Sequence, residues 1–219
     1  MYLCSYVVKN NGNKGIVNYF YHIMAEAITK KELKKIPVTK YEFIRPELMT
    51  GYIFFSSGSY TFSSFIQRLT KSVWSHVAII YKDVELQRVM VLEAEPKVGI
   101  RLIPLSKYLR DYKGTKKPYK GQVVIAKLNF DLEHESMNKA ISFGLDELTR
   151  PYDNWEILRI MFRILFRIGR KERNKSYICS ELVRDAFAKA GVTFRMHDTY
   201  ISPQEIWKDQ RVEFKYRVL

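Results

Sequence analysis

Runs of apolar residues separated by polar turns divide most of the chain into short strands. β-Branched and aromatic side chains are frequent in these runs, as is typical of strands with buried surfaces. The runs cover residues 51–58, 75–81, 89–94, 98–103, 122–128 and 212–218. Only a short polar segment separates the second run from the third, which indicates an antiparallel hairpin. The pattern therefore predicts a sheet with antiparallel pairing.

Apolar residues at helical spacing predict helices before, between and after the strands. We expect them over residues 16–35, 62–69, 104–110, 137–150, 155–173, 179–190 and 202–207. The last of these begins with a capping box formed by Ser202 and Glu205. Strands combined with helices in this way indicate an α+β fold. We divide the chain into an N-terminal helical extension, residues 1–45, and one further domain, residues 46–219.

The predicted hairpin carries a histidine on its first strand and a glutamate on its second. If its turn is centred on residues 84–85, His76 lies directly opposite Glu93. A register shifted by two residues would place Glu93 diagonally from His76, still on the same face and within reach. Glu95 also points to that face if the strand continues to it. A carboxylate on this face can hold the imidazole in one tautomer and stabilise the imidazolium.

The helix predicted over residues 179–190 begins with a cysteine. Its apolar positions form one buried face, and Gly191 stands where a helix C-terminal glycine is expected. Cys179 lies at the positive end of the helix dipole, which favours the thiolate. One interpretation is a buried core cysteine. The other is a nucleophile with His76 as base and Glu93 as orienting group, although periodicity alone does not bring Cys179 to the hairpin.

Residues 155–173 combine a cationic line with an otherwise apolar surface. Arg159, Arg163 and Arg167 recur every four residues, so a helix would place them on one face. One interpretation is a core helix with one solvated edge. The alternative is a segment that lies in a membrane interface or contacts acyl chains.

Composition and charge narrow the classes of protein. The 219 residues, 47% of them hydrophobic, suffice for one substantial core, and the net charge of +14 favours contact with phosphates. No zinc-finger spacing, ribonucleoprotein motif or leucine zipper is present, so a nucleic-acid partner is not expected. Two cysteines are too few for a disulfide framework or a cysteine-rich zinc site, and no metal or cofactor is expected. Without a signal peptide or membrane span, we expect a cytoplasmic protein, with peripheral binding to an anionic membrane as an alternative.

Several sequence blocks occur in an order that resembles a known family. They are Gly51-Tyr-Ile-Phe-Phe, Ser75-His-Val-Ala-Ile, Val91-Leu-Glu-Ala94 followed by Gly99-Ile, Pro151-Tyr-Asp153 and Tyr177-Ile-Cys-Ser-Glu-Leu-Val183. Over residues 48–210 the chain resembles the permuted NlpC/P60 papain-like proteins, and within them the YiiX-like and poxvirus branch. The resemblance implies a circularly permuted papain-like fold, in which an antiparallel sheet is packed by helices and residues 46–219 form the catalytic domain.

The resemblance also implies roles for individual residues. By motif, Cys179 is the nucleophile, His76 the general base and Glu93 the residue that orients it. Glu93 is preferred to Glu95 because it occupies the Glu-Ala position of the motif. Tyr177 either lines the acyl pocket or has a packing role. The chain departs from the pattern at Tyr52, where many relatives have aspartate, so the support that this aspartate supplies is missing or replaced.

The implied activity is that of a thiol hydrolase, such as an amidase or thiol protease. It would cleave an amide, peptide or ester bond through a thioester, with a small molecule, peptide or lipid as substrate. A second hypothesis is a membrane-associated lipid acyltransferase or phospholipase of the same fold, favoured by residues 155–173 and the positive charge. A third is a non-catalytic binding or host-interaction protein, which would predict the loss of a member of the triad.

Overall fold

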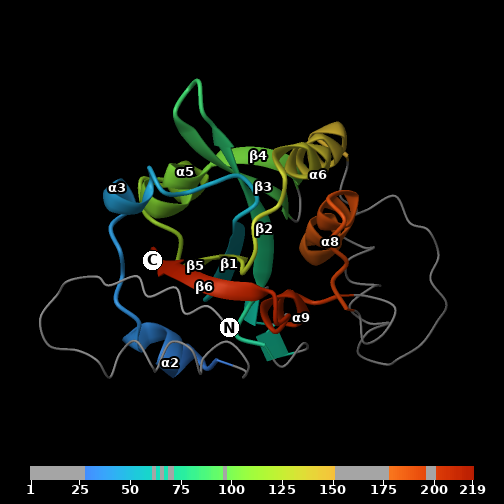
Figure 1. Ribbon diagram of the computed structural model, residues 1–219. Coiled ribbons are helices and arrows are strands. Elements are labelled where there is room, and N and C mark those ends of the chain that lie inside the picture. Colours follow the sequence, from blue (N-terminus) through green and yellow to red (C-terminus); the bar gives the residue numbers. More distant parts are fainter. Residues whose placement is uncertain are drawn as a thin grey trace, which may run out of the picture.

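A six-stranded antiparallel sheet lies at the centre of the described part of the chain (Figure 1). The computed structural model describes residues 28–60, 63–64, 67–68, 72–95, 98–150, 178–195 and 201–219. The strands are β1 (Ile53–Gly58), β2 (His76–Asp83), β3 (Arg88–Glu95), β4 (Gly99–Pro104), β5 (Gly121–Leu128) and β6 (Val212–Arg217). Their order is β4-β3-β2-β1-β5-β6, and each pair of neighbours is antiparallel. Every predicted strand is therefore confirmed, with bounds within two residues of those expected.

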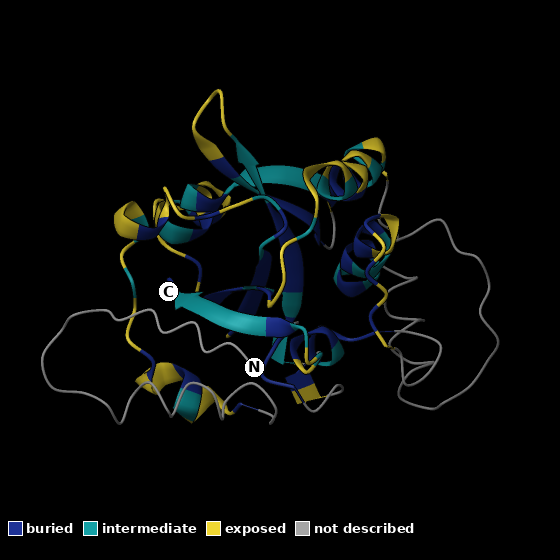
Figure 2. Cartoon of the chain, viewed as in Figure 1, coloured by how far each residue is buried: buried dark blue, intermediate teal, exposed yellow. Residues whose placement is uncertain are grey.

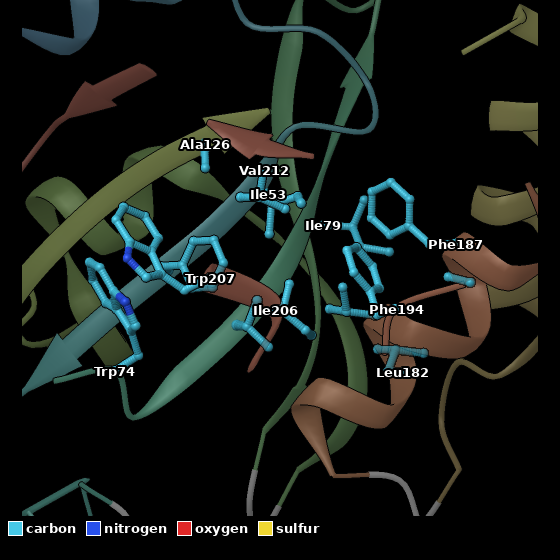
Figure 3. Packing of buried hydrophobic residues seen from close by; sticks show 14 of the residues in the cluster. Ile53, Trp74, Ile79, Ala126, Leu182, Phe187, Phe194, Ile206, Trp207 and Val212 are labelled. Atoms are coloured by element: carbon cyan, nitrogen blue, oxygen red, sulfur yellow. The ribbon is translucent and has the colours of Figure 1, made fainter. Parts of the chain in front are cut away.

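Alternation along the strands sends side chains into two separate hydrophobic cores. In β1, Ile53 and Phe55 enter one core, whereas Phe54 enters the other. The first core is covered by α6 (His134–Asp146), α8 (Cys179–Lys189) and α9 (Pro203–Trp207). Figure 3 shows the close packing there, with side chains of α8 and α9 facing those of the strands. On this face of the sheet, α8 thus packs against β2 and β3 and contacts α6 and α9.

The opposite face of the sheet carries the second core. It is covered by the short helices α3 (Tyr41–Ile44), α5 (Leu105–Arg110) and η1 (Tyr112–Gly114). Aromatic rings fill much of this side, and the ring centroids of Phe54 and Tyr108 are 4.8 Å apart. In Figure 1, α3 and α5 lie on the side of the sheet away from α6 and α8. Figure 2 shows both exposed and buried residues on α3 and α5.

The described part of the predicted N-terminal helix differs from the expectation in one respect. The basic run forms its own helix, α2 (Lys30–Lys35), and Thr29 before it is extended. The prediction of one helix over residues 16–35 is therefore wrong at Thr29; residues 1–27 lie outside the described residues. The reason is a capping box, in which the Thr29 hydroxyl accepts from the Glu32 N–H and the Glu32 carboxylate accepts from the Thr29 N–H. Leu33 of α2 is buried in the first core.

Helices α5, α6 and α9 agree with the sequence pattern. The capping box predicted at Ser202 is confirmed, with Pro203 at the first helical position of α9. Helix α6 begins at His134, a few residues before its predicted apolar stripe. The helix expected over residues 155–173 lies outside the described residues, and in the one expected over 62–69 only residues 63–64 and 67–68 are described, all helical.

Candidate active site

Helix α8 places Cys179 at its first residue. Ile178 before it is extended and forms the N-cap, so the N–H groups of the first turn point out of the helix end. The next turns bury Leu182 and Val183 against β2 and β3. Figure 3 shows Leu182 and Phe187 of α8 on the side of the helix that faces the strands. The apolar face thus anchors the helix and directs its N-terminal end toward the start of β2.

The far end and the start of α8 are both held by specific hydrogen bonds. Gly191, at φ +82°, ends the helix as predicted, with its N–H donating to Ala188 O. The Val192 N–H donates to Phe187 O, which completes a Schellman motif. Next to the cysteine, the Ser180 hydroxyl donates to Ile201 O at 2.6 Å. The serine of the Cys-Ser-Glu block therefore ties the cysteine end of α8 to the segment that leads into α9.

The hairpin of β2 and β3 carries His76 and Glu93 in the second of the two registers that the sequence left open. Ile79 pairs with Leu92, so the hairpin is shifted by two residues from one centred on residues 84–85. Of the two registers that the sequence left open, the one with Glu93 directly opposite His76 is therefore wrong, and the one shifted by two residues is confirmed. A shift of two leaves both residues on one face, and Glu93 lies diagonally from His76, within contact distance.

The physical reason for this register is the turn between β2 and β3. The last pair of the hairpin is Asp83 with Arg88, which leaves a connection over residues 84–87. The Leu86 N–H donates to the Asp83 carboxylate at 2.8 Å, and Gln87 adopts a left-handed conformation with φ +49°. An aspartate that caps its own turn and a residue in the left-handed region are local features that hydrophobic alternation does not reveal.

Glu93 is fully buried and holds three polar side chains. Its Oε2 lies 2.6 Å from His76 Nε2 and accepts from the Tyr108 hydroxyl at 2.5 Å. Its Oε1 accepts from Arg101 Nε at 2.9 Å and lies 2.8 Å from Arg101 Nη2. A buried carboxylate needs such partners because water no longer solvates it. The hydrogen bond to Nε2 leaves Nδ1 as the ring nitrogen of His76 that is available to the thiol.

These contacts change the protonation of the buried groups. Burial alone lowers the pKa of His76, but the hydrogen bonds and negative charges of Cys179 and Glu93 outweigh it and raise this pKa to about 10. Burial likewise raises the pKa of Glu93, and the hydrogen bond and charge of His76, with Arg101 and Tyr108, outweigh it and lower the pKa. Burial and the charge of Glu93 raise the pKa of Tyr108 well above its usual value. At neutral pH these contacts favour a protonated His76 beside the Glu93 carboxylate, with Tyr108 as a neutral donor.

We expect an NMR titration of the imidazole to report this arrangement directly. The pKa of His76 should lie well above its ordinary value of 6.5, and both Glu93→Gln and Cys179→Ala should lower it, because each removes a group that raises it. Glu213→Gln is the matched control: it removes a carboxylate that pairs with Lys127. A wild-type pKa at or below 6.5 would contradict the described contacts.

Sequence reasoning did not find Arg101 and Tyr108. Arg101 stands directly across from Glu93 in the β3–β4 pair. A charged residue inside the apolar run 98–103 was the signal in the sequence that could have indicated a buried partner of opposite charge. Tyr108 reaches the site from α5, and no spacing in the sequence indicates this contact. Glu95, the other candidate for orienting His76, instead has its Oε1 2.7 Å from Lys113 Nζ, and its Oε2 lies 3.7 Å from Arg101 Nη1. Of the two glutamates, Glu93 is the one that contacts the histidine.

Other predicted site residues lie outside the described residues. These are Tyr177 and the line formed by Arg159, Arg163 and Arg167. Within the described ranges, no cluster of three or more histidine, cysteine, aspartate or glutamate side chains could hold a metal ion. No helix in that part of the chain has the length and apolar character needed to cross a bilayer.

Comparisons with known proteins identify the family of this chain. Residues 47–214 match the model of a family described as permuted papain-like amidase enzyme, YaeF/YiiX, C92 family. A crystal structure described as metalloprotein yiiX from Escherichia coli O157:H7 is similar, with a TM-score of 0.56 and 18% sequence identity. That similarity covers 76% of this chain and 96% of the other, and it bears on the fold. A search of curated proteins found no match. The chain therefore has a circularly permuted papain-like fold and belongs to the permuted papain-like amidases of the YaeF/YiiX, C92 family.

Proposed function

We propose that the protein is a cysteine hydrolase that cleaves an amide, peptide or ester bond through a thioester on Cys179. The observation that carries this proposal is the 2.6 Å contact of His76 Nε2 with the buried Glu93 carboxylate. The influence of Cys179, which together with Glu93 raises the pKa of His76, supports the inclusion of the thiol. Membership in a papain-like amidase family supports a hydrolase of this type. The order of the triad along the chain, with the nucleophile last, agrees with a permuted fold.

The chemistry follows from the roles that each group is able to play. The thiolate of Cys179 attacks the carbonyl carbon, and the electron pair of the C=O bond moves to oxygen. When the tetrahedral adduct collapses, the bond to the leaving amine or alcohol breaks and the His76 imidazolium gives its proton to that group. Water then attacks the thioester while His76 accepts its proton. Collapse of this second adduct breaks the bond to sulfur, so the products are a carboxylic acid and the regenerated pair of Cys179 thiolate and His76 imidazolium.

Stabilisation of the oxyanion falls to the first turn of α8. Among the described residues no acceptor takes the N–H of Cys179, because it is one of the donors at the helix end that lack an intrahelical partner. A developing negative charge at this end is also favoured by the helix dipole. We assign this N–H as a hydrogen-bond donor to the oxyanion. The bond forms only during the reaction, when the oxyanion develops.

An acyltransferase is the second candidate, because the thioester can pass its acyl group to an acceptor other than water. The apolar and arginine-rich sequence of residues 155–173 favours a lipid substrate. The resemblance of the sequence blocks to the poxvirus branch of the NlpC/P60 superfamily favours the same possibility. The two candidates share the nucleophile and differ in the acceptor of the acyl group.

Two other readings receive less support. A non-catalytic binding or host-interaction protein would have no need for an imidazole that contacts a buried carboxylate and whose pKa is raised by a thiol. The E. coli structure is described as a metalloprotein. The described residues of this chain include no group of three or more histidine, cysteine, aspartate or glutamate side chains that could hold a metal ion, and the proposed reaction is written without one.

Acyl transfer to the thiol can be tested with a panel of activated esters that differ in acyl-chain length. We expect intact-protein mass spectrometry to show a single acyl group, and peptide mapping to place it on Cys179 rather than on Cys4. Slow release to water indicates a hydrolase, and transfer to an added lipid indicates an acyltransferase. If no acyl group accumulates or turns over at Cys179, and iodoacetamide labels Cys179 no faster than Cys4, the proposal fails.

A further inference from the structure

A second candidate site lies on the opposite face of the sheet from α8. It is a cavity of about 250 Å³ between α3, the start of β3, the end of β4 and α5. Its lining consists of Tyr41, Glu42, Arg45, Arg88, Val89, Pro104, Ser106 and Arg110. In Figure 1 the region lies where α3 and α5 approach each other beneath the β2–β3 hairpin.

The cavity is separate from the catalytic residues because α5 divides them. Tyr108 is buried and turns toward Glu93, whereas Ser106 and Arg110 are four residues apart and line the cavity. One helix therefore presents one face to the proposed active site and another to this cavity. None of the residues that line the cavity takes part in the proposed reaction.

The lining carries an excess of positive charge. It includes three arginines and one glutamate. Arg110 forms an ion pair with Glu42, and Arg45 donates to the carbonyl oxygen of Gln87. The side chain of Arg88 is exposed, and its guanidinium forms no hydrogen bond or ion pair with the described residues. A guanidinium in this position has its full set of donors available.

Tyr41 shares the lining with these charged groups. Burial raises the pKa of Tyr41, the charges of Arg45, Arg110 and Arg88 act to lower it, and the charge of Glu42 adds to the rise. Ser106 contributes a second hydroxyl to the lining. Guanidinium forks and hydroxyl donors around a small cavity are the groups that bind phosphate oxygens.

We infer that this cavity binds a phosphate group, with the guanidinium of Arg88 as its main free ligand and the Tyr41 and Ser106 hydroxyls as further donors. A phosphate carries a charge of about −1.5 to −2 at neutral pH, which balances the surplus of two positive charges in the lining. Arg45 and Arg110 keep donors to share, since a guanidinium has five N–H groups.

The phosphate can belong either to a free anion or to a lipid headgroup. Two apolar side chains lie beside the cavity in the sequence and are largely exposed: Phe43 on α3, at 69%, and Leu86 in the hairpin turn, at 70%. Apolar side chains at the edge of a cationic site are also found where proteins contact a membrane surface. A test therefore needs both sources of phosphate.

The test compares the full chain with Arg88→Gln and with Lys208→Gln. Lys208 is exposed at the end of α9, on the other side of the sheet, so its variant loses the same charge away from the cavity. The probes are pyrophosphate, measured by calorimetry, and phosphatidylcholine vesicles with and without phosphatidic acid, measured by flotation. Arg88→Gln should weaken binding of the effective probe about tenfold, as expected for one charged hydrogen-bonding group, and Lys208→Gln should not.

Each outcome bears on the inference. Binding of pyrophosphate identifies a free anion as ligand, and binding of only the phosphatidic-acid vesicles identifies a headgroup. The inference is overturned if neither probe binds, if Arg88→Gln binds as well as the wild type, or if Lys208→Gln loses as much affinity. Equal melting temperatures and equal thiol reactivity at Cys179 in all three proteins separate this result from misfolding and from failure of the proposed reaction.

Discussion

Replacing Cys179 by alanine should lower turnover of the best ester or amide substrate by about four orders of magnitude, because the variant has no nucleophile to form the thioester. Replacing His76 by alanine should cause a loss of similar size, since no other group accepts and returns the proton. The double variant should be no worse than either single one. Residues that act as one unit in a reaction are strongly non-additive.

The other cysteine in the sequence supplies the control for this prediction. Cys4→Ser removes the other thiol of the sequence, which is not one of the residues of α8, and should leave turnover unchanged. Steady-state kinetics on all four variants, with folding checked by circular dichroism, is the measurement. Substantial residual turnover in Cys179→Ala, or losses that add in the double variant, would contradict the assignment of Cys179 and His76 to one catalytic unit.

Replacing Arg101 by leucine should destabilise the folded protein by about 3 kcal/mol, because it leaves the buried Glu93 carboxylate with fewer partners. The guanidinium makes both of the contacts to Oε1 of Glu93, and only Tyr108 and His76 would remain on the other oxygen. Turnover should fall as well, since Glu93 would no longer be held in place beside His76. We regard Arg101 as a positioning residue that acts through Glu93.

The size of this loss should depend on pH. The contacts of Glu93 lower its pKa in the folded state, so they contribute stability above the unfolded pKa, and that stability is lost as the pH falls through the folded pKa. Arg101 is one of the groups that lower this pKa. The difference in unfolding free energy between wild type and Arg101→Leu should therefore be largest at neutral pH and shrink in acid. Urea denaturation at several pH values measures it.

Two further variants make this prediction specific. Adding Glu93→Gln to Arg101→Leu should recover part of the lost stability, because the uncompensated buried charge disappears. Lys139→Gln breaks an exposed ion pair with Glu135 on α6 and should change stability little. If Arg101→Leu costs no more than Lys139→Gln, or if the second substitution brings no recovery, the buried network does not contribute as described.

The strands could be predicted from the sequence because successive side chains of a strand enter the two cores in turn. β1 shows why: Phe54 enters one core and Phe55 the other, so both positions must be apolar. The register of the hairpin was not readable. It depends on how Asp83 closes the turn, and alternation is the same for registers that differ by two residues. The prediction that Glu93 and His76 share a face held because that shift preserves the face.

The sequence by itself determined the strands and most of the described helices, because each leaves a periodic signal, and its motifs led to the hypothesis that Cys179, His76 and a glutamate of the hairpin form a triad. Only the tertiary structure decided that Glu93 rather than Glu95 contacts His76, and that Arg101 and Tyr108 hold Glu93. The start of α8 is likewise brought to the start of β2 by packing of its apolar face. These contacts join residues far apart in the chain, and the turns and packing that align them are not encoded in the spacing of any one segment.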